Sequence, residues 1–369
     1  MAINYQNRLE TLQNSLENQN IDVAMITSPA NVFYYTGFNS DPHERFMGLI
    51  ADNRNQEYTL FVPALDEEVA ADESIVKQVV PISDEENPFK KLKDTLGENI
   101  TSFGLEMKSV SMYQHNQLVT HFPEASYVDI QPSINAQRLR KSESEMGYVQ
   151  QAVYIIEKVL AEGIKKVKIG MTELELTAEL EYLMKKFGAE GPSFSTTVLS
   201  GEKSALPHGS PGDRPFQKGD FLLIDMGVIK DGYCSDITRT FIIGEAADKQ
   251  KEIYDIVLKS NQAGVNSVEA GAPVKTFDIE ARKVINSHGY GDYFNNRVGH
   301  GLGIEVHEEP SIHEKNEGLA EQGMVFTIEP GIYIPGFGGV RVEDEVYINK
   351  SGKVKVLTSF PRELQILGV

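Results

Sequence analysis

Apolar residues in the amino-terminal third of the chain follow two alternating patterns. Over residues 1–130, short apolar runs of strand length alternate with segments in which apolar residues recur at helical spacing. The first such segment carries Tyr5, Leu9, Leu12 and Leu16. A strand stopped by Pro29 follows, and the alternation continues to about Ile130. The pattern predicts an open α/β domain, and this stretch contains no phosphate-binding glycine motif.

The pattern changes at residue 131. Residues 131–142 are polar and basic, and we interpret them as a linker. A long helix with one apolar stripe follows, and Thr172 and Glu175 then form a capping box in front of a second helix. Residues 143–369 are therefore predicted to form a second domain.

An internal repeat is visible in this second domain. An offset of 101 residues places Gly170 on Gly271 and Gly188 on Gly289, and each pair encloses a helix of matching length. Chance alignment of two glycine pairs is the alternative. A true duplication predicts two pseudo-symmetric halves that close over a shared sheet, with polar residues where the halves meet.

Two short stretches of the first domain could matter for function. Residues 31–38, NVFYYTGF, are apolar and end near a turn glycine, so we expect a core helix followed by a turn. A predicted loop then combines the carboxylate of Asp41, the imidazole of His43 and the guanidinium of Arg45. From composition alone, a solvated loop is the expectation for such a cluster.

The balance of charges excludes some partners. The 369 residues include 54 acidic and 35 basic ones, which gives a formal charge of -19. Such a chain is repelled by a phosphate backbone or an anionic membrane surface, so neither nucleic acid nor membrane is expected as a partner. Cys234 is the only cysteine, the amino terminus turns polar at once, and no apolar run reaches membrane-spanning length. A cytoplasmic enzyme is the expectation.

Four acids and one histidine between residues 221 and 343 stand in apolar or glycine-flanked settings. They are Asp225, Asp236, His300, Glu329 and Glu343. Acidic residues are rarely buried unless they are paired or bind a cation, so this set calls for a shared partner. An oxygen-rich set with one imidazole suits manganese, cobalt, iron or zinc in a catalytic pair, and we expect two divalent ions here.

The two aspartates lie on either side of a hairpin signal at residues 230–232. A turn centred between residues 230 and 231 would place Asp225 directly opposite Asp236, and two opposed carboxylates are tolerated only with a cation between them. Two unrelated aspartates near a turn are the alternative. Likewise, His300 lies among glycines that admit a close neighbour, although a lone histidine is more often structural.

Five motifs carry a resemblance to a known family. LLIDMG, YCSDITRT, GHGLGIEVHEEP, FTIEPGIY and GVRVED resemble, in order and spacing, the metal-dependent pita-bread peptidases, which include methionine aminopeptidase, aminopeptidase P and prolidase. The additional amino-terminal domain, the length and the TGFNSDPHERF block are most similar to the short bacterial Xaa-Pro dipeptidases. The resemblance implies an α+β chain in which a creatinase-like α/β domain precedes a pita-bread catalytic domain.

The resemblance also implies roles for individual residues. Asp225 would hold one metal ion, Asp236 and Glu343 would bridge both, and His300 and Glu329 would hold the other. Manganese is expected, with cobalt or zinc as alternatives. A hydroxide bridging the ions would attack the imide bond of an Xaa-Pro dipeptide.

Four residues take catalytic or positioning roles on the same resemblance. Glu329 would also act as general base, while His208 and His307 would contact the substrate and stabilise the tetrahedral intermediate. Arg341 would orient Glu343 and Asp236 or meet the substrate carboxylate.

One departure from the family concerns the substrate's free carboxylate. Larger prolidases carry an arginine between the second substrate histidine and the TxEPG motif, and this chain has none there. Arg297, Arg341 and Arg45 are the candidates to replace it. In short bacterial prolidases the amino-terminal domain overhangs the partner's site, which implies a homodimer with residues 41–45 at the entrance.

Three functions remain open at this point. A dipeptidase for Xaa-Pro is favoured. An aminopeptidase P that releases the first residue of longer Xaa-Pro peptides would use the same metal site. A pita-bread binding module or metal-free relative such as creatinase is the third, but such proteins typically lose metal ligands, and all five are present here.

Overall fold

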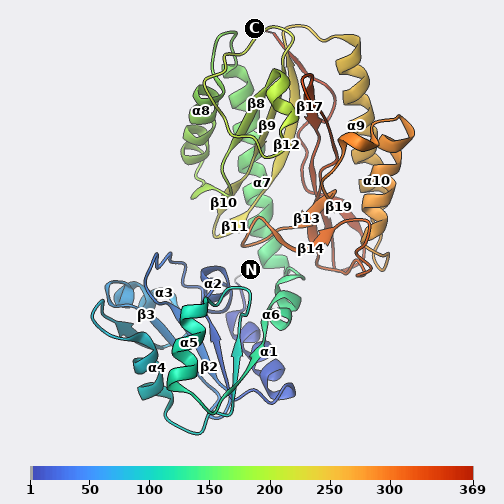
Figure 1. Cartoon of the computed structure of the whole chain (residues 1–369). Coiled ribbons are helices and arrows are strands. Elements are labelled where there is room, and N and C mark those ends of the chain that lie inside the picture. The colour runs from blue at the N-terminus through green and yellow to red at the C-terminus, as the bar shows by residue number, and fades with distance from the viewer. Residues whose placement is uncertain (1–2, 369) are drawn as a thin grey trace. The chain divides into compact units, whose positions relative to one another are not determined.

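The computed structural model describes residues 3–368. It divides into two compact units, of which the first ends at Arg138 and the second begins at Leu139 (Figure 1). Most of the predicted linker at 131–142 is in fact helix α6 (Gln131–Arg138), which belongs to the first unit and buries Ile134. Among the described residues, every helix is too short or too polar to span a membrane.

The first unit is built on a six-stranded sheet flanked by helices (Figure 1). The strand order is β4-β3-β2-β1-β5-β6, and β1 runs antiparallel to β2 but parallel to β5. The strands are β1 (Val23–Ile26), β2 (Gly48–Asp52), β3 (Glu57–Pro63), β4 (Gln78–Ile82), β5 (Ser102–Leu105) and β6 (Ser126–Asp129). The helices are α1 (Tyr5–Asn18), α2 (Pro29–Thr36), α3 (Glu67–Glu73), α4 (Pro88–Leu96), α5 (Met112–His121) and α6. The predicted α/β fold of this unit is confirmed.

Local signals account for several of these elements. Asn87 caps α4 by accepting from the backbone N–H groups of Phe89 and Lys90, with Pro88 in the first helical position. Helix α2 is the expected core helix, and it ends at Gly37, whose φ of 82° suits a residue without a side chain. On one face of the sheet, α4 and α5 close the core with Phe89 and Leu118.

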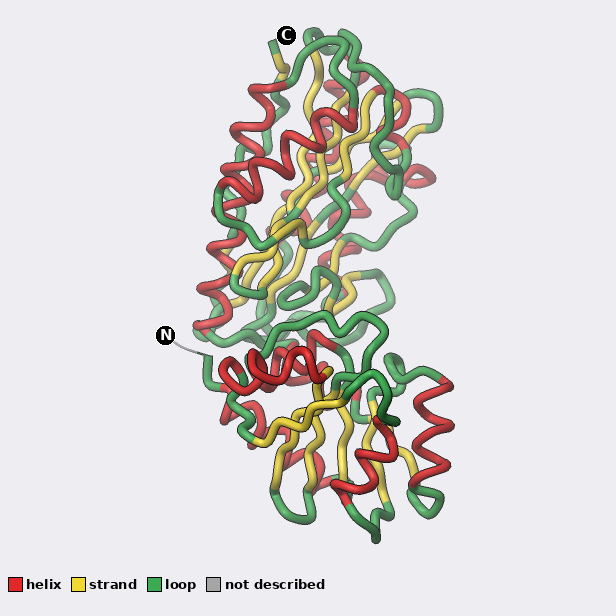
Figure 2. The backbone as a smooth tube through the Cα atoms, turned by 90° about the vertical axis from the view of Figure 1, so that its left-hand side faces the viewer, coloured by secondary structure: helices red, strands yellow, loops and turns green. Residues whose placement is uncertain are grey.

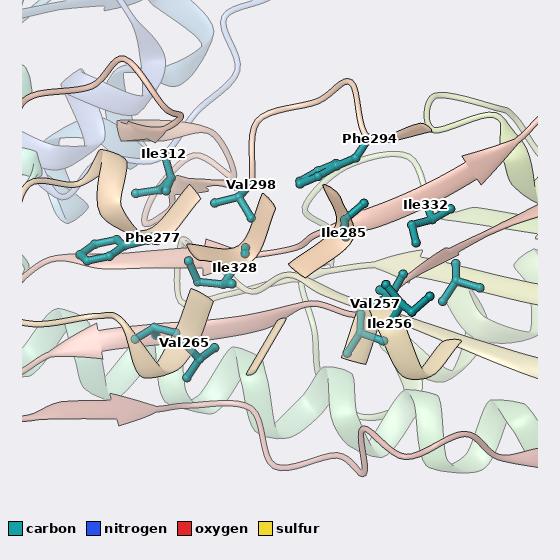
Figure 3. Close-up of a cluster of buried hydrophobic side chains, with 14 of the residues drawn as sticks. Ile256, Val257, Val265, Phe277, Ile285, Phe294, Val298, Ile312, Ile328 and Ile332 are labelled. Atoms are coloured by element: carbon teal, nitrogen blue, oxygen red, sulfur yellow. The ribbon is translucent and has the colours of Figure 1, made fainter. Parts of the chain in front are cut away.

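In the second unit, two helix pairs each cover a sheet (Figures 1 and 2). Helices α7 (Glu143–Gly163) and α8 (Glu173–Lys186) pack on the sheet β20-β12-β9-β8, and α9 (Asp248–Asn266) and α10 (Lys275–Ser287) pack on the sheet β14-β13-β15-β18-β19. Figure 3 shows part of the second core, a buried cluster to which Val257 of α9, Phe277 of α10 and Ile328 all belong. The predicted mixed helix and sheet domain is therefore confirmed.

Fourteen strands complete this unit. They are β7 (Gly191–Pro192), β8 (Thr197–Ser200), β9 (Phe221–Met226), β10 (Val228–Lys230), β11 (Tyr233–Cys234), β12 (Ile237–Ile243), β13 (Gly299–Gly301), β14 (Glu308–Ile312), β15 (Val325–Ile328), β16 (Gly331–Ile334), β17 (Gly338–Arg341), β18 (Asp344–Ile348), β19 (Val354–Val356) and β20 (Ile366–Leu367).

The two halves do not share one hydrogen-bonded sheet, contrary to the expectation from the repeat. Each half has its own sheet, and the two are joined where β12 meets residues 341–343. There the backbone N–H of Glu343 donates to the carbonyl of Thr238 at 3.2 Å. This seam between the sheets is where the polar residues of the second unit converge.

Candidate metal centre

Strand ends from both halves carry the five predicted ligands. Asp225 lies on β9 and Asp236 in the break before β12, while His300 lies on β13. Glu329 directly follows β15, and Glu343 directly precedes β18. Residues separated by more than a hundred positions therefore meet at the seam.

The predicted pairing of the two aspartates is wrong by two residues. Asp225 pairs with Thr238 across the ladder, not with Asp236. The turn consists of Asp231 and Gly232, whose φ angles of 50° and 75° are both left-handed. Since these two residues form the turn, the hairpin centre lies one residue later than expected, and each residue faces a partner two positions further along.

The ligand atoms nevertheless converge in space. One ligand atom each from Asp236, His300 and Glu343 lies within 4.8 Å of the other two. The His300 Nε2 atom is 3.7 Å from Asp236 Oδ2 and 3.3 Å from Glu329 Oε1. Asp236, His300 and Glu343 are only 4%, 3% and 1% exposed, so water cannot screen this concentration of charge.

The pKa values of the four acids reflect their burial and the charges around them. Burial, together with the neighbouring carboxylates, raises the pKa of Asp236 and of Glu343 well above the ordinary carboxyl range. Burial also raises the pKa of Asp225, although the Arg341 guanidinium opposes this shift. Burial alone would raise the pKa of Glu329 too, but the hydrogen bond and charge of His300 lower it overall. Asp225, Asp236 and Glu343 therefore hold a proton more tightly than ordinary carboxyl groups, and Glu329 holds one less tightly.

Three carboxylate oxygens at this site test whether the residues fit a metal ion. Asp225 Oδ1, Asp236 Oδ1 and Glu343 Oε1 are buried and have no hydrogen-bond partner among the described residues. Buried polar atoms are nearly always hydrogen bonded or bound to an ion. The donor set, with oxygens from four acids and one imidazole nitrogen, therefore fits divalent cations.

Sequence analysis did not single out Thr238, which links Glu343 to Arg341. Its hydroxyl donates to Glu343 Oε2 at 2.7 Å and accepts from Arg341 Nε at 3.0 Å. Arg341 also donates to Tyr333 and forms an ion pair with Asp225. Strand alternation is the signal that could have found Thr238, because it lies two positions after Asp236.

Arg341 therefore acts on different residues than expected. It pairs with Asp225 and lies 3.8 Å from Glu329 Oε2. It reaches Glu343 through Thr238, whereas among the described residues no hydrogen bond or ion pair joins it to Asp236. Asp236 is held instead by its backbone N–H, which donates to Glu345 Oε1 at 2.7 Å. The Arg341 guanidinium already donates to Asp225, Thr238 and Tyr333, which leaves few N–H donors for a substrate carboxylate.

Glycines around His300 have the expected role of admitting close neighbours. A Cβ atom on Gly299 would lie 1.9 Å from the carbonyl oxygen of Thr327, and one on Gly301 would lie 2.0 Å from that of Glu309. Only glycine permits this backbone approach. The His300 backbone N–H donates to the Thr327 hydroxyl at 3.2 Å, which fixes β13 against β15.

A cavity of about 630 Å³ opens onto the acids. His208, Arg297 and His307 all line it, as do Asp225, Asp236, His300, Glu329 and Arg341. The His307 ring meets the His300 ring edge-on with centroids 4.3 Å apart. Burial, His300 and Arg297 lower the pKa of His307 to about 4, so its imidazole is neutral at pH 7.

The loop with Asp41, His43 and Arg45 belongs to the first unit, and it is an irregular segment as expected. Arg45 Nε donates to Asp84 Oδ1 at 2.8 Å, and His43 Nδ1 lies 3.4 Å from Asp41 Oδ2. These contacts are those of a solvated, self-paired loop. The predicted place of the loop at the site entrance stays a prediction.

Comparison with known proteins places these features in a family context. Residues 147–350 match metallopeptidase family M24, and residues 8–140 match the creatinase/prolidase N-terminal domain. A Bacillus subtilis (strain 168) protein named as a candidate dipeptidase, YkvY, is 40% identical over 364 residues, which cover 98% of this chain and 100% of that protein.

Solved structures give the same result. An Xaa-Pro dipeptidase from Bacillus anthracis matches with a TM-score of 0.90 at 32% identity, over 99% of this chain and 100% of its own. An X-Pro aminopeptidase from Thermotoga maritima matches with a TM-score of 0.85 at 33% identity, over 95% of this chain and 99% of its own. Both domains of the predicted fold are thereby confirmed.

Proposed function

Since the chain belongs to metallopeptidase family M24, we propose that it is an Xaa-Pro dipeptidase that hydrolyses the imide bond of Xaa-Pro dipeptides. The observation that carries this proposal is the set of three unpartnered carboxylate oxygens beside a cavity lined by two further histidines. The acids are the candidate metal ligands, and the histidines and Arg297 are further polar residues that line the cavity. A cavity of about 630 Å³ is in the range of small-ligand sites.

The proposed metal ligands are Asp225, Asp236, His300, Glu329 and Glu343. Two divalent ions held there would polarise the scissile carbonyl and make a water molecule acidic enough to react near neutral pH. Manganese is our proposal for the ion, with cobalt and zinc as alternatives, because the hard oxygen donors accommodate all three. A cytoplasmic location and a homodimer belong to the same proposal.

The chain's own residues then handle the proton and the developing charge. Glu329, whose pKa is lowered by His300, is ionised at neutral pH and accepts a proton from the attacking water. It returns that proton to the prolyl nitrogen, which has no hydrogen of its own in the imide bond. His307 is neutral, so its N–H group can donate to the oxygen on which negative charge develops, and His208 supplies a second donor.

Arg297 is the residue that we propose for the substrate's carboxylate. It lines the cavity, and its Nη1 atom donates to Ser311 Oγ at 3.0 Å. Arg341 lines the same cavity but is committed to Asp225, Thr238 and Tyr333. A half-buried guanidinium with remaining N–H donors suits a carboxylate better than one whose donors are already used.

An aminopeptidase P activity is the second candidate, because the Thermotoga maritima X-Pro aminopeptidase has the same fold at 33% identity. The discriminating experiment compares hydrolysis of Ala-Pro and Ala-Pro-Ala-Ala by protein reconstituted separately with manganese, cobalt and zinc. A dipeptidase cleaves Ala-Pro and rejects the longer peptide, because its site closes around a free carboxylate. Preferential release of alanine from Ala-Pro-Ala-Ala would instead identify an aminopeptidase P.

A further inference from the structure

Glu173 is a fully buried carboxylate that none of the motifs includes. It is the first residue of α8, where Thr172 and Glu175 already form the capping box. Its exposed fraction is 0%, so it does not serve the helix terminus from the solvent side, as a first-turn acid usually does. A buried acid needs strong partners, and Glu173 finds them outside its own helix.

Four donors surround this carboxylate. Its Oε1 atom accepts from the backbone N–H of Ser200 at 2.7 Å and from the Ser200 hydroxyl at 2.9 Å. Its Oε2 atom accepts from the backbone N–H of Gly212 at 2.9 Å and from Lys203 Nζ at 2.5 Å. Each oxygen thus accepts two hydrogen bonds, and one of the four donors is the charged amine of Lys203.

These donors stand at the two ends of one loop. Ser200 is the last residue of β8, Lys203 lies in the first turn after it, and Gly212 lies where the chain returns to α8. Between them is the exposed tip that carries His208. A single carboxylate therefore closes the base of the loop, and the Leu174 backbone N–H adds a bond to the Gly212 carbonyl at 3.2 Å.

The loop has a second attachment on the side of the metal centre. The backbone N–H of Gly339, on β17, donates to the Ser204 hydroxyl at 2.8 Å. A Cβ atom on Gly339 would lie 2.3 Å from the Ser204 carbonyl oxygen, so the loop packs directly on the strand that ends at Arg341. These attachments lie at residues 200–204 and 212, while residues 206–208 at the tip are exposed.

We propose that Glu173 is a positioning residue that acts through His208, by holding the base of residues 200–212 so that the imidazole stays at the cavity wall. This rests on the proposed function in one respect, namely that His208 contacts the substrate. Misplacing a catalytic donor by about 1 Å costs up to roughly 100-fold in rate. Loss of the clamp therefore acts on turnover, although Glu173 touches neither the cavity nor the candidate ligands.

The test replaces Glu173 by glutamine and uses Glu175→Gln as the matched control. The control makes the same change of charge on the same helix turn, and glutamine still serves a capping box. In Glu173→Gln, the amide nitrogen cannot accept a hydrogen bond, so at least one of the four bonds is lost, and the Lys203 amine loses its negatively charged partner. We expect kcat/KM on Ala-Pro to fall about 10- to 100-fold for Glu173→Gln and less than about 2-fold for the control.

A double-mutant cycle separates positioning from general damage. In a His208→Ala background, Glu173→Gln should lower kcat/KM by less than about 3-fold, because the group that it positions is already absent. Amide hydrogen exchange should accelerate in residues 200–212 and stay unchanged around His300. If Glu173→Gln yields no folded protein, Lys203→Met weakens the same clamp from a partly exposed position and takes its place in the cycle.

Two results would overturn the proposal: unchanged exchange in residues 200–212, or an equal loss of kcat/KM with and without His208. The exchange measurement needs no substrate. A wild-type enzyme that cleaves no Xaa-Pro dipeptide therefore refutes the proposed function and leaves the clamp to be judged by exchange alone.

Discussion

Replacing Arg297 by methionine removes a charge from the cavity wall while keeping a side chain of similar length. Arg297 Nη1 donates to Ser311 Oγ at 3.0 Å, and the side chain is half-buried at the cavity. We predict that this variant loses its preference for substrates with a free carboxylate. The loss should concern recognition of the substrate's proline end and not the hydrolytic step itself.

The size of the effect follows from the contacts available to this guanidinium. A hydrogen bond to a charged group contributes about 1.5–3 kcal/mol when its partner is removed. Because Arg297 is partly exposed to water, the lower part of that range applies. At about 1.4 kcal/mol for each factor of ten, kcat/KM on Ala-Pro should fall about 10- to 30-fold.

The assay pairs two substrates that differ only at the carboxylate. Ala-Pro carries a free carboxylate, and Ala-Pro amide does not. Wild-type enzyme should prefer the acid, and Arg297→Met should bring the two kcat/KM values close together by slowing only the acid. Arg45→Ala is the control, because Arg45 is another arginine considered for this carboxylate and lies in the first unit.

Three results would contradict this reasoning. Equal losses on acid and amide would mean that Arg297 acts on the catalytic groups and not on the carboxylate. No loss on either substrate would remove Arg297 from recognition altogether. A collapse of the acid preference in Arg45→Ala but not in Arg297→Met would transfer the role to the loop of the first unit.

Other consequences of the structure are open to measurement. Removing divalent metal with a chelator should lower the unfolding temperature, and manganese at about 100 times its dissociation constant should restore about 2.7 kcal/mol; an unchanged melting curve would argue against the metal centre. Lys141 and Glu308 form a buried ion pair at 2.9 Å whose side chains are 2% and 6% exposed. Lys141→Met should lower the free energy of unfolding, measured with denaturant, by about 3–5 kcal/mol. The double variant Lys141→Met, Glu308→Gln should lose less stability than the single variant, and an equal loss would exclude the ion pair as the cause. Burial would raise the pKa of Asp22, but hydrogen bonds from Thr101 and Ser102 lower it overall from its ordinary value of 3.8. The folded state thus binds that proton less readily than the unfolded state, so the stability advantage over Asp22→Asn should be full above pH 3.8 and shrink as the pH falls further; a constant difference would contradict the shift.

Local sequence signals were enough for the elements and for the identity of the acids. Helix α4 begins at Pro88, where Asn87 supplies the cap and the proline suits the first helical position. Helix α8 begins after Thr172, as its capping box indicates. The acids were found because carboxylates in apolar strand ends conflict with burial unless something compensates them, and that conflict is visible in the sequence itself.

Contacts between distant segments could not be read in the same way. The partner of Asp225 depends on which two residues form the turn, and a shift of one residue moved it from Asp236 to Thr238. Glu173 reads locally as a helix-start acid, and only the return of the chain at Gly212 makes it a buried clamp. In both cases the deciding interaction joins segments whose separation the local pattern does not encode.

The segments that carry the acids are fixed where the two halves meet. Arg341 pairs with Asp225 and lies 3.8 Å from Glu329 Oε2, while His300 Nε2 lies 3.3 Å from Glu329 Oε1. The Asp236 backbone N–H donates to Glu345 and the Glu343 backbone N–H to the Thr238 carbonyl, so neither segment can shift without breaking a buried hydrogen bond. The packing of the two halves thus brings carboxylates from distant segments to one place, which is the arrangement that a site for divalent ions requires.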